Sequence, residues 1–305
     1  MTTAVLAAAS AEDVWRFQPH PEVWLLLGAL VGLYAYAVRV IGPKVVPAGQ
    51  TVVSRRQLVA FVLGIAGLWV ASDWPMHDIA EEYLFSVHMG QHLLLTLVLP
   101  PLFLIATPRW LADLVLGRAR VRRVVRFLAL PVAAGVVYNA LVMFTHWPVV
   151  VNGAVEQGAV HYGLHILVVS SALLMWTPVC GPIEEWRISL PAQMVYLFMM
   201  SVLPTVPGAW LTFATNPLYA AYDTPLRMWG ISPESDQQTA GLLMKLGGGT
   251  YLWTIITGMF FTWAARHEAA QQSGRVVDER EVLTWETVEA EFARTPPVPD
   301  PAPKR

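Results

Sequence analysis

Charged residues are scarce in this chain. Lys, Arg, Asp and Glu make up 14% of its 305 residues, whereas soluble domains carry about 25%. The formal net charge is −2, so the chain also lacks the basic surface that nucleic acid requires. Apolar residues reach 55% and the mean hydropathy is +0.48. This composition predicts a polytopic membrane protein.

Cysteine is almost absent as well. Cys180 is the only one, which excludes an internal disulfide and a thiolate metal cluster. We expect Cys180 to pack as a small apolar residue. Met1–Ser10 has no basic region and only a short apolar run, so we expect the first helix to insert without cleavage of a signal peptide.

Hydrolase signatures are missing too. A zinc peptidase has Glu directly after the first histidine of its i, i+4 pair, but Met89 and Tyr162 occupy these positions here. A Ser or Cys nucleophile elbow is not found either. We therefore expect a protein that is not an enzyme.

Seven apolar segments each have about the length that a spanning helix needs. They predict an all-α, seven-helix transmembrane domain over residues 20–266, after a short tail at 1–19. Residues 267–305 are expected to form a tail with a short amphipathic helix from Thr284 and a disordered, Pro-rich end. Kinks are expected at Pro131, Pro204 and Pro207. The segments are Pro21–Val40, Gln57–Trp74, Ser86–Ala106, Val124–Thr145, Ala159–Val179, Pro191–Ala214 and Gln238–Ala265.

The distribution of basic residues predicts the orientation. Most of the 20 Lys and Arg residues lie in the connections after the first, third, fifth and seventh segments. The positive-inside rule then places the N-terminus outside and the C-terminus in the cytoplasm.

Histidines gather at the predicted outer ends of the segments. Two pairs are spaced i, i+4, in His88-Met-Gly-Gln-His92 and His161-Tyr-Gly-Leu-His165, so each pair shares one helix face. Neutral imidazole is the commonest metal-binding side chain. The pattern predicts a metal-binding rim on the outer side, made of His77, His88, His92, His146, His161 and His165.

The surrounding residues suggest which metal the rim binds. Imidazole suits copper, zinc, iron and nickel, and nearby thioethers of Met76, Met89 and Met143 would favour Cu(I). Other neighbours are candidates to fix the imidazole tautomers or line the site. These are Asp73, Asp78, Met89, Gln91, Asn139, Glu156 and Gln237.

Other interpretations remain open at this point. A single interfacial histidine is usually a hydrogen-bonding residue, so His77 can be a loop residue and His146 a helix-end cap. His92 and His165 can instead be the axial pair of a membrane haem. Lys245 lies within the seventh segment, where an ammonium is costly.

Three motifs together resemble one family, the CtaG family of caa-type cytochrome c oxidase assembly factors. The first is Ser86-Val-His-Met-Gly-Gln-His92, followed by Pro100-Pro101. The second is His161-Tyr-Gly-Leu-His165, followed by Trp176-Thr-Pro178. The third is Asp236-Gln-Gln-Thr-Ala-Gly241. The resemblance covers the second to seventh segments, and Lys245 departs from it, since an uncharged residue is expected there.

This resemblance implies a multi-pass protein of the bacterial plasma membrane that helps a haem–copper oxidase to mature. Copper would be its metal and oxidase subunits its partners. By position, the family's histidines correspond to His88, His92, His161 and His165, and further to His77 and His146. A haem-binding membrane redox protein and a copper permease are the alternatives.

Overall fold

The computed structural model describes residues 15–223, 228–280, 285, 289 and 293–294. Every regular element in these residues is a helix, which confirms the all-α class for the described part of the chain. The chain divides into two compact units, Met1–Thr257 and Gly258–Arg305. The first unit contains all six histidines of the predicted rim.

Five helical stretches of the described residues are long and apolar enough to cross a membrane. Several are built from shorter helices joined end to end, including π-helical turns labelled η2 and η3. The stretches are Pro21–Val45 (α1 Pro21–Tyr36, η2 Ala37–Ile41, α2 Gly42–Val45), Arg55–Glu82 (α3 Arg55–Ser72, α4 Met76–Glu82), Phe85–Ala106 (α5 Phe85–Leu93, η3 Leu94–Val98, α6 Leu99–Ala106), Gly158–Cys180 (α11) and Leu190–Phe213 (α12 Leu190–Val202, α13 Thr205–Phe213).

Proline breaks the fourth predicted segment instead of only kinking it. α8 (Ala119–Leu128) and α9 (Pro131–Thr145) meet at an angle of 73° and count as a sixth span only if the bent pair is taken together. Pro131 is the first residue of α9, where its missing N–H costs nothing. In the same way, Pro204 separates α12 from α13, while Pro207 lies inside α13.

The seventh predicted segment is helical but is not among the apolar spans. It corresponds to α14 (Pro233–Leu242), the π-turn η7 (Leu243–Gly247) and α15 (Gly248–Arg280). The count of seven spans and the orientation of the termini therefore stay predictions. The predicted domain boundary at residue 266 falls inside α15, and most of the short helix expected from Thr284 lies outside the described residues.

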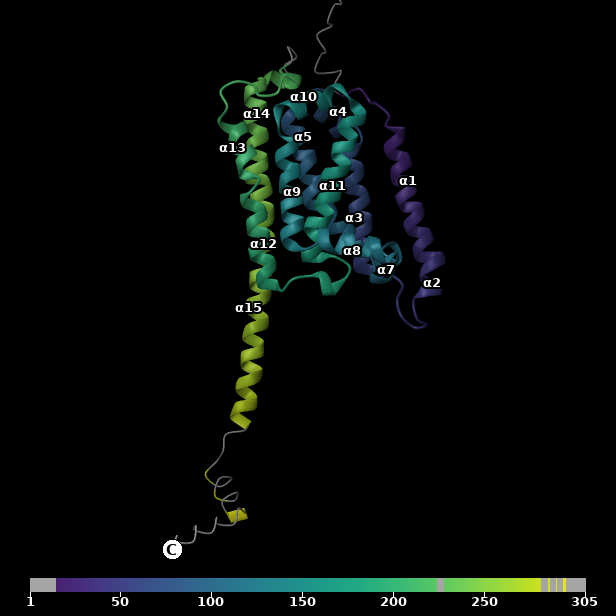
Figure 1. Ribbon diagram of the computed structural model, residues 1–305, viewed down its shortest axis with the longest axis vertical. Coiled ribbons are helices and arrows are strands. Elements are labelled where there is room, and N and C mark those ends of the chain that lie inside the picture. Colours follow the sequence, from purple (N-terminus) through teal and green to yellow (C-terminus); the bar gives the residue numbers. More distant parts are fainter. Residues whose placement is uncertain (1–14, 224–227, 281–284, 286–288, 290–292, 295–305) are drawn as a thin grey trace, which may run out of the picture. The chain divides into compact units, whose positions relative to one another are not determined.

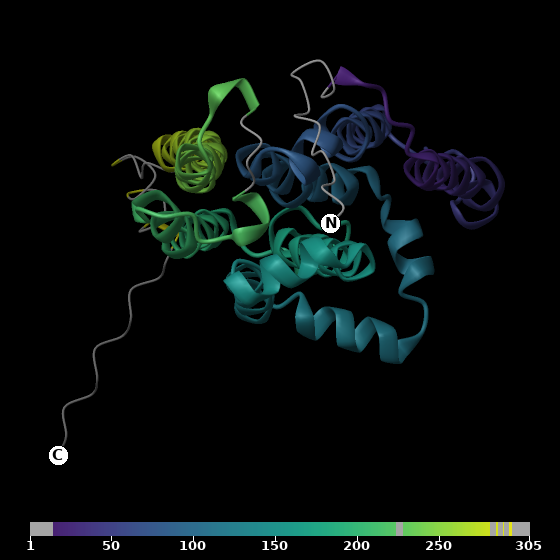
Figure 2. The same ribbon diagram turned by 90° about the horizontal axis from the view of Figure 1, so that it is seen from above.

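The helices that bear histidines meet at one end of the first unit. α4, α5 and α10 (Pro148–Glu156) lie at this end, whereas α7 (Arg109–Val115) and α8 lie at the opposite end (Figure 1). Seen along the bundle, the teal α9–α11 region lies beside the blue α3–α6 region (Figure 2). α11 packs against η3, α6 and α9, so residues from distant parts of the sequence face one another.

A buried tryptophan sets the depth of α11 against the third span. The indole N–H of Trp176 donates to the carbonyl of Thr96 at 3.1 Å, and the side chain is only 2% exposed. Thr96 belongs to η3, one turn after His92, and its hydroxyl donates to the His92 carbonyl at 2.7 Å. The contact therefore connects the turn after His92 in the third span with the C-terminal part of α11.

Asp236 holds the first turn of α5. Its carboxylate is 4% exposed and accepts the backbone N–H groups of Phe85 at 2.6 Å and Ser86 at 3.0 Å. α14 itself is capped by Ser232, which accepts from the N–H of Ser235. Asp236 thus satisfies amides that would otherwise lack a partner in the helix bearing His88.

We expect Asp236→Ala to lower the free energy of unfolding by about 1–3 kcal/mol, because two buried N–H groups lose their acceptor. Asp236→Asn keeps one acceptor oxygen and should cost less. Thermal unfolding of the detergent-solubilised protein measures both. Equal midpoints for the parent and the Ala variant would contradict this role.

The predicted orientation can be tested with single cysteines, because Cys180 is the only native one. In a Cys180→Ala background, we expect a membrane-impermeant maleimide to label Asn216→Cys in intact cells. Arg118→Cys should react only after permeabilisation. Both native side chains are exposed and lie in connections at opposite ends of the first unit. The reverse labelling pattern would place the histidine end in the cytoplasm.

Candidate metal centre

The two i, i+4 histidine pairs face each other across two helices. His88 and His92 lie on α5 with ring centroids 4.6 Å apart, and His161 and His165 lie on α11 with centroids 4.5 Å apart. Between the helices, His88 is 5.5 Å from His161 and His92 is 4.7 Å from His165. The four predicted rings therefore form one cluster.

A glutamate that the sequence analysis did not select completes a ligand set. One ligand atom each from Glu81, His88, His161 and His165 lies within 4.8 Å of every other. Two ligands of one ion, each about 2.0–2.2 Å from it, are at most about 4.4 Å apart. Four tetrahedral ligands at this distance are about 3.4 Å from one another, so side-chain movements of about 1 Å would let all four bind one ion.

The ligand atoms of this set lack other partners. Within the described residues, Glu81 Oε1, His88 Nδ1, His161 Nε2 and His165 Nε2 are buried and make no hydrogen bond. Glu81 Oε1 lies 2.7 Å from His161 Nε2, so these two atoms contact each other directly. Buried polar atoms are nearly always paired, so the unpartnered nitrogens of His88 and His165 beside this contact fit a bound cation.

A small cavity adjoins the ligand set. Its volume is about 40 Å³, and aliphatic residues of α10 and the ring of Tyr222 form part of its wall. His88 and His161 are 7% and 8% exposed. Water is therefore largely excluded from these two rings, whereas the Glu81 side chain is 27% exposed and lies at the edge of the site.

His146 lies next to this cluster, at the C-terminal end of α9. Its Nδ1 is 2.7 Å from the Val142 carbonyl, so Nδ1 donates and Nε2 keeps its lone pair. Nε2 is buried and has no hydrogen-bond partner in the described part of the chain. His146 and His92 line the cavity above and also a second one deeper in the bundle.

His77 does not join the four-residue set. Its ring lies 4.9 Å from that of His20, and its Nδ1 is 3.4 Å from the Gln91 amide nitrogen. His20 in turn contacts the Asp78 carboxylate at 2.8 Å. Burial lowers the pKa of His20, but the carboxylates of Asp78 and Glu22 outweigh burial and raise it above its ordinary value.

Several proposed neighbours of the histidines have other partners. Asp73 accepts the indole N–H groups of Trp24 and Trp69, and Asn139 donates to the Gly135 carbonyl and to the Met200 sulfur. Gln237 accepts from the Leu218 N–H and donates to the carbonyls of Leu211 in α13 and of Asn216 in the following loop. These residues do not orient imidazoles. The Glu156 side chain lies outside the described residues.

The thioethers near the histidines differ from those predicted. Met143 is 43% exposed, which excludes it from the site, and Met76 lies against Gly90 without lining either cavity. Met89 is buried and lines both cavities, as its position beside His88 suggested. Met244 lines the deeper cavity and was not predicted.

Lys245 does not oppose a cation in either cavity. Its side chain is exposed and lines a separate outer groove with Phe198 and Trp253. The departure of Lys245 from the family resemblance therefore leaves the lining of both cavities unchanged.

Comparison with known proteins identifies the family. The family model described as cytochrome c oxidase caa3 assembly factor matches residues 32–266. No curated protein and no solved structure matches the chain. The match covers well over half of the sequence and includes all the histidines of the two i, i+4 pairs. The chain belongs to the cytochrome c oxidase caa3 assembly factor family.

Proposed function

We propose that this protein binds a copper ion at Glu81, His88, His161 and His165 and supplies it to an oxidase subunit during assembly. It would act in the bacterial plasma membrane and would not be an enzyme. The observation that supports this function is the convergence of four ligand atoms from α4, α5 and α11, of which the nitrogens of His88 and His165 are buried and have no partner in the described residues. The oxidase is proposed as the partner because the chain belongs to a family of cytochrome c oxidase assembly factors.

The ligand set is compatible with copper but does not by itself select copper over other metals. Three imidazoles and one carboxylate also suit zinc in a tetrahedral site. The family favours copper, because oxidases of this kind require copper centres during assembly. Two further imidazoles, His92 and His146, stand beside the set, and the thioether of Met89 lines the same cavity.

Glu81 has a particular role in this proposal. A carboxylate is a hard ligand and binds a soft cuprous ion weakly. Its negative charge nevertheless offsets part of the cost of placing a cation among buried imidazoles. Glu81 would therefore admit the ion without holding it tightly, which allows ligand exchange with a partner protein.

The geometry speaks against the haem alternative. His92 and His165 have ring centroids 4.7 Å apart. Axial nitrogens each stand about 2.0 Å from a metal with their rings beyond, so such rings are farther apart than these. The adjoining cavities, about 40 and 50 Å³, are also far too small for a macrocycle.

Copper binding by the purified protein tests the site directly. We expect His88→Ala with His165→Ala to weaken copper binding at this site by more than about 100-fold. Loss of a residue that only supports a ligand costs up to about 100-fold in metal affinity, and loss of two ligands should cost more. Glu81→Gln should weaken it less, because it removes charge but keeps the shape. The matched control is His267→Ala, an exposed histidine of α15. Unchanged copper affinity in the double variant would exclude the site.

Maturation in cells tests the function. We expect cells that produce His161→Ala as their only copy to assemble oxidase with little activity per molecule. The variant itself should still be present in the membrane at the parental level, as an immunoblot shows. His267→Ala should mature oxidase normally. Full oxidase activity in the His161 variant would refute the copper-supply function.

A further inference from the structure

A second cavity lies directly below the proposed copper site. Its volume is about 50 Å³, and it is formed by parts of α5, η3, α9, α11, α12, η7 and α15. Met89, His92, Thr145, His146 and Val168 line both cavities, so they form the wall between them. Two of these shared residues are imidazoles.

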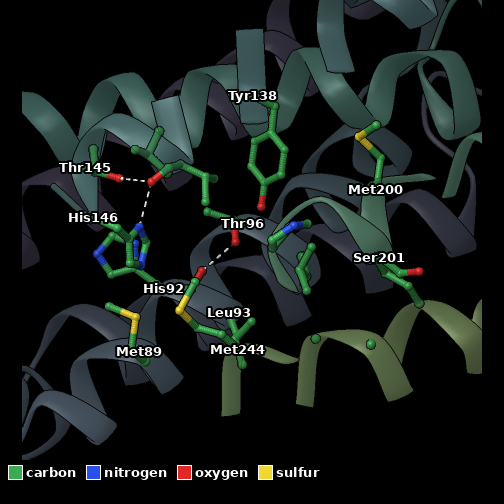
Figure 3. Close-up of a pocket in the computed structure, with 17 residues that line it drawn as sticks. Met89, His92, Leu93, Thr96, Tyr138, Thr145, His146, Met200, Ser201 and Met244 are labelled. Atoms are coloured by element: carbon green, nitrogen blue, oxygen red, sulfur yellow. Dashed lines mark hydrogen bonds between the residues drawn. The ribbon is translucent and has the colours of Figure 1, made fainter. Parts of the chain in front are cut away.

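His146 directs an unused nitrogen into this region. The side chain is 7% exposed, Nδ1 is occupied by the Val142 carbonyl, and Nε2 has no hydrogen-bond partner among the described residues. The ring of His92 stands beside it in the close-up (Figure 3). A helix-end position explains where His146 lies but leaves this buried lone pair without a partner.

Two thioethers accompany the imidazoles. Met89 and Met244 are 3% and 9% exposed and pack in the same buried cluster. Both line the same cavity as the two rings, and in the view of Figure 3 Met200 is drawn on the other side of Tyr138. The Met200 sulfur already accepts the Asn139 amide at 3.3 Å. Met89 and Met244 are thus the sulfur donors available to the pair.

Water is the ordinary occupant of such a space, since about 10–15 Å³ suffices for one molecule with two to four polar partners. The cavity offers few free donors to hold it. The hydroxyl of Thr96 donates to the His92 carbonyl, and that of Thr145 donates to carbonyls of α9. The hydroxyls of Tyr138 and Ser201 also line the cavity, and that of Ser201 donates to the Phe198 carbonyl. The soft or nitrogenous side chains in the lining are those of the imidazoles and thioethers.

The backbone is also irregular on two sides of the cavity. η3 contributes Thr96 and Leu97, and η7 contributes Met244. π-Turns within α-helices occur often at functional sites, because the extra residue turns a side chain away from the regular helical direction.

We propose that His92, His146, Met89 and Met244 form a second metal site, specific for a soft monovalent cation such as Cu(I). The four ligands are uncharged, and thioether with imidazole selects Cu(I) over harder ions. A divalent ion would keep more uncompensated charge in this buried position. His92 and His146 line both cavities, so a Cu(I) ion passes from the upper site to the lower one by exchanging Glu81 and its imidazoles for neutral ligands, without electron transfer.

This inference does not require the proposed copper site, because the two ligand sets share no residue. Cu(I) or Ag(I) titration of the purified Cys180→Ala protein tests it, since that background has no thiolate. We expect two ions per chain, and X-ray absorption of the copper form should show sulfur at about 2.3 Å, the usual metal–sulfur distance. One ion per chain without sulfur neighbours would overturn the second site.

Substitutions separate the two sites. Met89→Leu with Met244→Leu keeps the apolar volume and should remove the sulfur signal and one bound ion. His88→Ala with His165→Ala should remove the other ion and leave the sulfur signal. Met143→Leu and Met200→Leu are matched controls and should change neither. A sulfur signal that survives the Met89 and Met244 substitutions would refute this ligand set. If the methionine variant loses an ion but the His88 and His165 variant binds as many ions as the parent, the upper site is refuted.

Discussion

The packing of α5 against α11 is the constraint on which both proposed sites depend. An i, i+4 pair presents two imidazoles on one face, but only a fixed rotation and depth of two helices makes two such pairs meet. Here Asp236 anchors the first turn of α5, and Trp176 ties α11 to the turn after His92. Both anchors are buried polar contacts, which are specific in direction where apolar packing alone tolerates sliding.

The two cavities differ mainly in the charge of their ligands. This difference favours movement of a soft cation from the upper cavity to the lower one. The upper set includes the carboxylate of Glu81, whereas the lower set contains only neutral nitrogen and sulfur. An anion favours any cation, including hydrated ones that arrive from solution, while thioethers favour a soft one. An ion that enters near Glu81 and settles near Met244 would thus be selected for softness in the second step.

Much of this arrangement followed from the sequence, because helical periodicity is a local property. The all-α class and the two histidine pairs are of this kind. Glu81 was missed although it lies i, i+4 from His77, because only the turn between α4 and α5 brings it to His88. Met244 is distant in sequence from His92, and no local pattern connects them. At Pro131 the structure has a break between two helices where the sequence predicted a kink within one. Proline has no N–H to lose a hydrogen bond at the first position of a helix, so a new helix can start there without that cost.

Lys245 shows why the placement of a charge matters more than its presence. A lysine one residue after a proposed ligand would repel a cation if both side chains faced the same way. Neighbouring residues on a helix point in different directions, and here Met244 is buried while Lys245 is exposed in an outer groove. Repulsion between the ammonium and a bound ion falls with distance. The same helix can therefore supply a soft ligand to the interior and a positive charge to its outer face, where an acidic group of another protein or a lipid phosphate can balance it.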